Sequence, residues 1–207
     1  MSVIHVVAWT FKSAAPDAER RAVNDGLARG KGIPQARTFA LGENKSTARA
    51  NGFTHLYVAS FDDRDALAAF QKDQVHAPWG PRLVEAAEQL LVLDLECGAG
   101  DAPRTGLRGL RHVVAWSFKD GTSEQEKRAV VDGLQRQREV KPARSFAAGA
   151  NLGLSARSLG HTHLHVSTFD DFDGLEEFRS DTVIHAPAGK RMQASAGHIT
   201  ALDVTDN

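Results

Sequence analysis

The two halves of this 207-residue sequence repeat one another. The run HVVAWTFK at residues 5–12 returns as HVVAWSFK at 112–119, and four further blocks follow in the same order in each half. Agreement of that kind indicates a tandem duplication, which has to be recognised before secondary structure is assigned. We therefore predict two similar domains, residues 1–97 and 111–207, joined by a linker at 98–110 that is rich in Gly, Pro and small residues.

Each repeat has the pattern of a β-α-β-β-α-β unit. In the first repeat, β-branched and aromatic residues predict strands at 3–11, 38–41, 54–61 and 91–95, and apolar residues at helical spacing predict helices at 16–29, 65–73 and 78–90. This order is that of the ferredoxin-like split βαβ fold, whose sheet carries helices on one face only. The other face needs a partner, which the second repeat supplies. We predict an α+β fold in which two ferredoxin-like repeats form an intramolecular barrel, a pseudo-dimer; whether it dimerises further is left open.

Composition narrows the class of protein. Hydrophobic residues make up 42% and charged residues 25%, and the formal net charge is −1, so no overall field favours nucleic acid. No apolar run approaches the roughly 18 residues of a membrane helix, and the first residues lack the pattern of a signal peptide. The single cysteine, Cys97, rules out an internal disulfide framework. We expect a cytoplasmic protein with a small-molecule ligand and neither nucleic acid nor membrane as partner.

Alternation along the strands sorts the side chains into two faces. His5, Val7 and Trp9 share one face of the first strand, and Val6 and Ala8 share the other. We expect the face with histidines and large aromatics to look into the barrel and line a pocket there. The small aliphatic face would then lie under the helices.

The repeated blocks resemble the stress-responsive A/B barrel (Dabb) family. The resemblance rests on HVVxxxFK, Gly-x-Asn after the second strand, THxxxxxFDD and the His-Ala-Pro segment, in both halves. It implies a dimeric α+β barrel, here fused in one chain. It also implies cofactor-free chemistry, since the best-understood activity of the family is an aldol-type ring closure of a polyketide by a histidine and a tyrosine.

The resemblance assigns roles to residues of the first repeat. The catalytic histidine aligns with His76, and the pocket histidines align with His5 and His55. The catalytic tyrosine aligns with Phe70, which cannot transfer a proton and is left to line the substrate site. Tyr57, the one tyrosine of the chain, shares a face with His55 and is our candidate substitute.

Other side chains of the first repeat are candidates for substrate binding. Arg37 is a permanently charged fork that can hold a carboxylate or an enolate, and Trp9 and Trp79 are broad apolar walls. Each candidate of the first repeat also has a purely structural alternative. Arg37 can be an ordinary surface arginine, the tryptophans can fill the core, and His5 and His55 can be buried histidines that join strands. His76 can be a helix-end histidine bonded to a free carbonyl.

The second repeat predicts a second, different pocket, because Tyr57 and Trp79 are replaced there by His165 and Ala188. Its candidate residues are His112, His163, His165, His185, Arg144 and Trp116. His161, His163 and His165 occupy alternate positions, so their side chains would project from the same face of a strand, a spacing that can bind a metal ion. Catalytic metal sites normally add a carboxylate, and the nearest ones in the sequence are Asp170 and Asp171 at the helix cap. We therefore predict no metal site. Glycine-rich phosphate loops are absent from the sequence, and we predict no cofactor.

Together with the resemblance, these residues predict a cofactor-independent enzyme of the cyclase, lyase or isomerase type. It would act on a small polyketide-like or aromatic carbonyl compound, with His76 as base, His5 and His55 as polarising groups and Arg37 as anion holder. Two alternatives remain open: a non-catalytic stress-responsive or ligand-carrier barrel, and a metal-dependent lyase that uses the histidine-rich strand.

Overall fold

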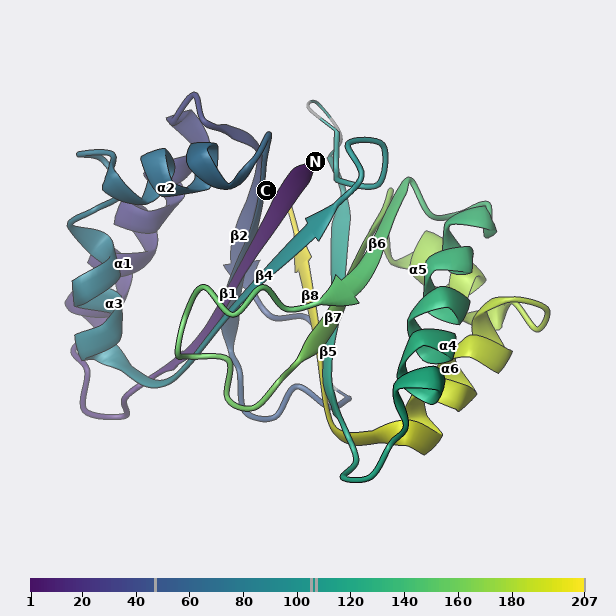
Figure 1. Ribbon diagram of the computed structural model, residues 1–207. Coiled ribbons are helices and arrows are strands. Elements are labelled where there is room, and N and C mark those ends of the chain that lie inside the picture. The colour runs from purple at the N-terminus through teal and green to yellow at the C-terminus, as the bar shows by residue number, and fades with distance from the viewer. Residues whose placement is uncertain (47, 105, 107, 207) are drawn as a thin grey trace.

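A computed structural model describes residues 1–46, 48–104, 106 and 108–206, and its two halves have the same architecture (Figure 1). The first half consists of β1 (Ser2–Phe11), α1 (Asp17–Ala28), a 3-10 turn (Arg29–Gly32), β2 (Ala36–Glu43), β3 (His55–Phe61), α2 (Arg64–Lys72), α3 (Trp79–Ala86) and β4 (Ala87–Cys97). The second consists of β5 (Leu110–Phe118), α4 (Glu124–Gln135), a 3-10 turn (Arg136–Glu139), β6 (Ser145–Ala150), β7 (His163–Phe169), α5 (Phe172–Ser180), α6 (His185–Ser195) and β8 (Ala196–Thr205).

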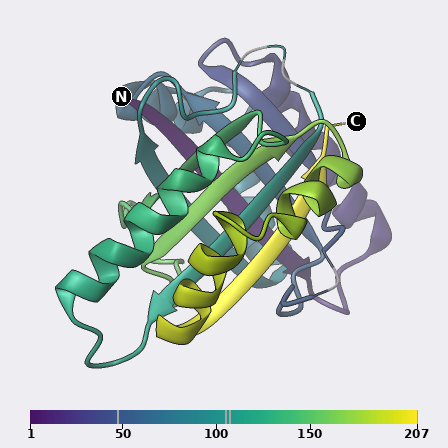
Figure 2. The same cartoon turned by 90° about the vertical axis from the view of Figure 1, so that its right-hand side faces the viewer.

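Each half contains one antiparallel four-stranded sheet. The strand orders are β2-β3-β1-β4 and β6-β7-β5-β8, which is the predicted ferredoxin-like topology in duplicate. The helices lie on the outer faces, as Figure 2 shows for α4, α5 and α6. The chain is therefore a pseudo-dimer of two α+β units, as predicted.

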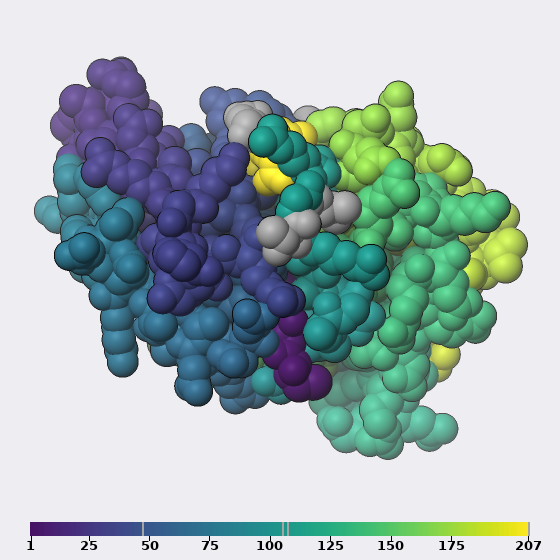
Figure 3. All heavy atoms as spheres, turned by 90° about the horizontal axis from the view of Figure 1, so that it is seen from above, coloured from purple at the N-terminus to yellow at the C-terminus, as the bar shows by residue number. Residues whose placement is uncertain are grey.

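A shared aliphatic core joins the two sheets. Side chains such as Ile4 and Val6 from the first sheet and Val113 and Val166 from the second belong to one buried cluster. The edges of the two sheets also meet, β4 beside β6 and β2 beside β8, which closes the barrel. Seen from above, the halves lie side by side with the chain around residue 100 across their junction (Figure 3).

The predicted orientation of the strand faces is wrong. Val7, Trp9 and Tyr57 belong to a second cluster that packs under the helices, against Val23 and Leu27 of α1. The aliphatic face looks into the barrel instead, because facing sheets lie roughly 10 Å apart and small branched side chains fill that space. Any pocket lined by the histidines thus lies between a sheet and its helices.

Some element boundaries also differ from prediction. The last helix of the first repeat ends at Ala86, not at residue 90, because β1 runs to Phe11 and pairs with β4 as far as Ala87. β5 begins at Leu110, inside the predicted linker. Asp63 caps α2, since its carboxylate accepts a hydrogen bond of 2.8 Å from the Ala66 amide.

Gly26 lies in the middle of α1, where a glycine normally weakens a helix. A Cβ atom at this position would lie 2.0 Å from the Trp79 ring, so only glycine lets α3 pack this closely. The corresponding Gly133 has no such neighbour, its nearest atom being 3.8 Å away.

Each half sends the segment before its third strand across the other half. We call residues 151–162 the repeat-two arm and residues 44–54, of which Thr47 is not described, the repeat-one arm. The Leu152 amide donates to the Asp94 carbonyl (2.9 Å), and the Asn151 side-chain oxygen accepts from the Asp94 amide (3.0 Å). The repeat-one arm makes the same contacts with Asp203. The Lys45 amide donates to the Asp203 carbonyl (2.8 Å), and the Asn44 side-chain oxygen accepts from the Asp203 amide (2.9 Å). Each sheet is thereby extended by a piece of the other half.

No helix of the described part of the chain is both long and apolar enough to cross a membrane.

Candidate active site

Three neighbouring strands bring the side chains of an aspartate, a histidine and a tyrosine together in one buried hydrogen-bonded chain. His5 Nδ1 lies 2.7 Å from an Asp94 oxygen, and His5 Nε2 lies 2.9 Å from the Tyr57 hydroxyl. The register of β1 and β4 places His5 directly opposite Asp94. All three side chains are at least 97% buried, so these contacts are shielded from water.

The protonation of this chain follows from its donors and acceptors. An ionised Asp94 carboxylate can only accept, so His5 donates through Nδ1 and offers the Nε2 lone pair to the Tyr57 hydroxyl. Burial, and to a lesser extent the Asp94 charge, raises the pKa of Tyr57 well above its usual value of 10.0. Tyr57 is therefore a neutral phenol that can donate a hydrogen bond.

His76 lies beside this hydrogen-bonded chain, in the turn that follows α2. Its ring centre is 4.4 Å from that of Phe70 and 6.3 Å from that of Tyr57. Burial, followed by the neighbouring His5, lowers the pKa of His76 to about 4, which makes it a neutral imidazole at physiological pH. Its Nδ1 atom is buried and has no hydrogen-bond partner among the residues that the structure describes. The structural alternative for His76, a helix-end histidine bonded to a free carbonyl, therefore finds no such carbonyl at this atom within the described part of the chain.

A cavity of about 370 Å³ is lined by the polar side chains of His5, Tyr57 and His76. Gln71 adds an amide, and the walls are apolar, formed by residues such as Leu27, Leu83 and Val92. Leu154, Ser155 and Arg157 of the repeat-two arm complete the lining. The arm, green in Figure 1, passes over β4 to reach this position. The site is thus built from both halves of the chain.

Several predicted site residues of the first repeat lie outside this cavity. His55 stacks on Trp9, with ring centres 5.6 Å apart, and faces a different hollow beside Arg20. Arg37 forms an ion pair of 2.6 Å with Asp62. Trp79 packs on α1, and the Arg82 guanidinium lies 4.7 Å above its ring. Of the predicted residues, the structure brings together His5, Tyr57 and His76, with Phe70 against the His76 ring.

The second repeat keeps the histidine–aspartate pair and loses the tyrosine. His112 lies 2.6 Å from Asp203, but His165 replaces the phenol, 5.6 Å away from ring centre to ring centre. Arg179 stands where the first repeat has Gln71 and approaches Asp203 to 3.9 Å. Burial and the neighbouring histidines hold the pKa of His165 well below its usual value. This side is a buried histidine cluster that lacks a phenolic proton donor.

The remaining candidates of the second repeat have structural partners. His185 Nδ1 lies 3.3 Å from the Gln137 side-chain oxygen, and Arg144 forms an ion pair with Asp170. His163 stacks on Trp116 as His55 does on Trp9.

His161 does not share a site with the histidines of β7. It precedes the strand, and its ring nitrogens lie 2.9 Å from the Ser158 carbonyl and 2.8 Å from the Thr200 hydroxyl. Within the described residues, no group of three or more His, Cys, Asp and Glu side chains could hold a metal ion.

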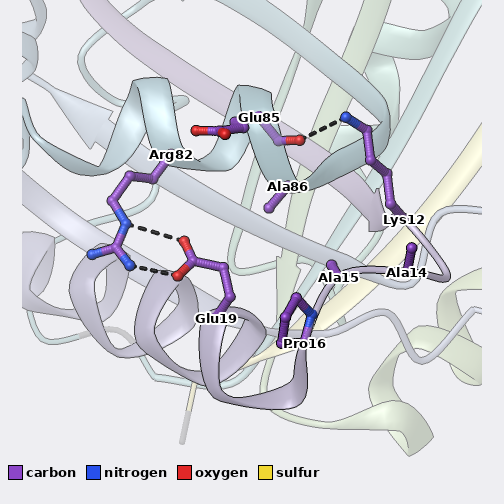
Figure 4. Close-up of a pocket in the computed structure, with 8 residues that line it drawn as sticks. All are labelled: Lys12, Ala14, Ala15, Pro16, Glu19, Arg82, Glu85 and Ala86. Atoms are coloured by element: carbon purple, nitrogen blue, oxygen red, sulfur yellow. Dashed lines mark hydrogen bonds and ion pairs between the residues drawn. The ribbon is translucent and has the colours of Figure 1, made fainter.

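Another hollow of the first half, of about 440 Å³, lies between the end of β1 and helices α1 and α3 (Figure 4). Arg82 donates two hydrogen bonds to Glu19 across it, and Lys12 donates to the Glu85 carbonyl. The second repeat has the same contacts, Arg191 to Glu126 and Lys119 to a carbonyl of α6. Because both halves share this arrangement, we assign it to helix packing.

Sequence reasoning missed Asp94 and Arg157. Asp94 interrupts the apolar run LLVLDLE, and a lone carboxylate inside an otherwise buried strand is a signal of a buried hydrogen-bonded partner. Arg157 gives no such signal, since its position depends on how the two halves pack.

Comparison with known proteins gives the family. The stress-response A/B barrel domain-containing protein HS1 of Arabidopsis thaliana is 27% identical over 70 residues, which are 33% of this chain and 64% of that protein. A candidate monooxygenase from Fusobacterium nucleatum superposes with a TM-score of 0.68 at 10% identity, covering 99% of this chain and 91% of its own. An anthrone oxidase-like protein superposes with a TM-score of 0.57 at 12% identity, covering 99% and 90%. At these identities the two structures establish the shared fold. The Stress responsive A/B Barrel Domain matches residues 3–97 and again 110–206, and the chain therefore belongs to this family, with the domain present twice.

Proposed function

We propose that the chain is a cofactor-independent enzyme that moves protons next to the carbonyl group of a small molecule. The observation that carries the proposal is the buried hydrogen-bonded series Asp94–His5–Tyr57, which ends in a cavity beside the neutral His76. Removal of a proton next to a carbonyl needs a base and a group that stabilises the enolate oxygen. The cavity holds one candidate for each role.

In the proposed step, His76 accepts the proton from the carbon next to the carbonyl. The electron pair of the broken C–H bond moves to the carbonyl oxygen, and the Tyr57 hydroxyl turns its single proton from His5 Nε2 to the enolate oxygen that forms. Before this step His5 Nε2 positions the phenol by accepting its proton in a hydrogen bond, and Asp94 fixes the tautomer of His5. The imidazolium of His76 balances the enolate charge and returns the proton at the end. The enolate is the common intermediate of aldol-type cyclisation, lyase and isomerase chemistry.

The proposal assigns the activity to the first repeat. The second repeat offers His165 where the phenol should be, and Arg179 lies near the buried carboxylate. It serves the first repeat as the other wall of the barrel and as the source of the repeat-two arm.

Deuterium exchange tests the proposal without a known substrate. We would incubate the protein with 3-acetylbenzoate in D₂O and follow the loss of the methyl protons by NMR. We expect exchange above the buffer rate, and a decrease of roughly 100-fold in His76→Gln. Tyr57→Phe should lower the rate to a similar degree.

The second repeat supplies the matched control. His185→Gln changes the corresponding histidine, which contacts Gln137, and should leave the exchange rate unchanged. Exchange at the buffer rate with wild-type protein, or equal rates in His76→Gln and wild type, would contradict the proposal.

Ligand carriage without catalysis is the second candidate function. The histidine–aspartate pair favours it, because the pair occurs in both halves and so also stabilises strand pairing. A carrier would bind 3-acetylbenzoate, with shifts of the His5 and His76 signals, and would not accelerate the exchange.

A further inference from the structure

Building on the proposed function, we propose that the substrate carries a carboxylate at the end remote from the reacting carbonyl. Arg157 of the repeat-two arm binds this carboxylate at the mouth of the cavity of the first repeat. The two halves of the chain would then share one substrate: the first supplies the chemistry and the second recognises the charge.

The charges around the cavity support an anionic ligand. Among the described residues that line it, Arg157 is the one permanently charged side chain, and none is an aspartate or a glutamate. Across the described part of the chain, the Arg157 guanidinium has no ion-pair partner, and the side chain is exposed at the cavity. Arg37 and Arg144, the arginines suggested by the sequence, are already paired with Asp62 and Asp170. An anion entering the cavity therefore meets an unneutralised guanidinium, and no described residue of the lining carries a competing carboxylate.

Backbone contacts hold this arginine in place. The Val92 amide of β4 donates to the Arg157 carbonyl at 3.0 Å. The arm is also tied to β4 at Asp94 through Asn151 and Leu152, so the segment that carries Arg157 is held to β4 at two points. The backbone that carries the cation is thus part of a built wall of the cavity.

The register gives the span between the two ends of the site. Val7 lies opposite Tyr57 on one side and opposite Val92 on the other, and Val92 contacts Arg157. Tyr57 and Arg157 are therefore separated by three strand spacings of roughly 4.8 Å, or about 14 Å between their backbones. Both side chains line the cavity between them. The phenol and the guanidinium can contact opposite ends of one small molecule.

The chemistry of the lining indicates the rest of the ligand. A guanidinium is a planar fork that matches a carboxylate with two parallel hydrogen bonds. Apolar side chains such as Leu27, Val84 and Leu90 also line the cavity, and its volume of about 370 Å³ is at the small end of the range for ligand sites. We infer a small, flat or short-chain keto acid.

A neutral isostere tests this inference. 3-Acetylbenzamide has the shape and the reacting ketone of 3-acetylbenzoate but carries no charge. We expect wild-type protein to exchange the methyl protons of the carboxylate with a kcat/KM about tenfold higher than those of the amide. In Arg157→Gln this preference should vanish through a higher KM for the carboxylate, with kcat unchanged.

Arg49 supplies the matched control. Its carbonyl accepts from the Ala201 amide at 2.9 Å, which is the same arm contact in the other half, but it does not line this cavity. Arg49→Gln should keep the preference for the carboxylate. Circular dichroism of both variants checks that the fold is intact.

The outcomes separate this inference from the function on which it rests. Equal kcat/KM for the two compounds in wild-type protein, or an unchanged preference in Arg157→Gln, would overturn the role of Arg157 and leave the proposed enolate chemistry standing. Exchange of neither compound above the buffer rate would contradict the proposed function and this inference with it.

Discussion

Replacing His76 by glutamine should change how the stability of the protein depends on pH. Burial, with a smaller contribution from His5, lowers the pKa of His76 from 6.5 to about 4, and the residue is 7% exposed. Because the pKa in the folded state lies below that in the unfolded state, the folded protein binds this proton more weakly. The stability contributed by the neutral imidazole is complete above about pH 6.5 and is lost as the pH falls toward 4.

The pKa difference sets the size of the effect. Over the whole window it corresponds to about 3 kcal/mol of unfolding free energy, of which about 2 kcal/mol is lost by pH 5. Glutamine does not titrate, so this loss should be absent from His76→Gln. The histidines that both proteins retain, such as His55 and His165, contribute equally to both and cancel in the difference.

Urea unfolding at several pH values between 4.5 and 7.5 measures this difference. We expect the unfolding free energy of wild type to fall more steeply than that of His76→Gln below pH 6.5. The two curves should approach one another by about 2 kcal/mol between pH 7 and pH 5. Parallel curves would mean that His76 titrates as an ordinary histidine, and the argument that burial keeps it neutral would fail.

Two further predictions use the internal repeat as a control. Gly26→Ala should lower the unfolding free energy by about 1–3 kcal/mol, because the added Cβ meets the Trp79 ring at 2.0 Å. Gly133→Ala, with its nearest atom at 3.8 Å, should be neutral or stabilising by up to about 1 kcal/mol in the same urea titration; similar losses in both would contradict the packing argument. Asp94→Asn should slow deuterium exchange roughly 100-fold, whereas Asp203→Asn should leave the rate unchanged. Equal rates in the two aspartate variants would show that the buried pair acts only in strand pairing.

Much of the fold follows from the sequence, because the repeat and the strand patterns are local features. The blocks around His5 and His112 predict two equal halves, and the single-faced sheets predict that the halves bury one another. The orientation of the faces does not follow. Alternation indicates that Val7 and Trp9 lie on the same side of β1, but which side turns toward the helices is decided by tertiary packing.

The candidate site is predictable only in part, for the same reason. His5 and Tyr57 can be selected from residue type and strand parity, and His76 from the resemblance to the family. Asp94 joins them through the pairing of β1 with β4, and Arg157 through the packing of one half on the other. Both contacts join residues far apart in the sequence, and neither leaves a periodic pattern.

Side-chain NMR of the histidines, with and without 3-acetylbenzoate, tests the central claim most directly. If the cavity of the first repeat is the working site, the ligand shifts the signals of His5 and His76 and leaves those of His112 and His185 in place. Shifts confined to His112 and His185, or no shift of any histidine signal, would contradict the assignment of the site to the first repeat.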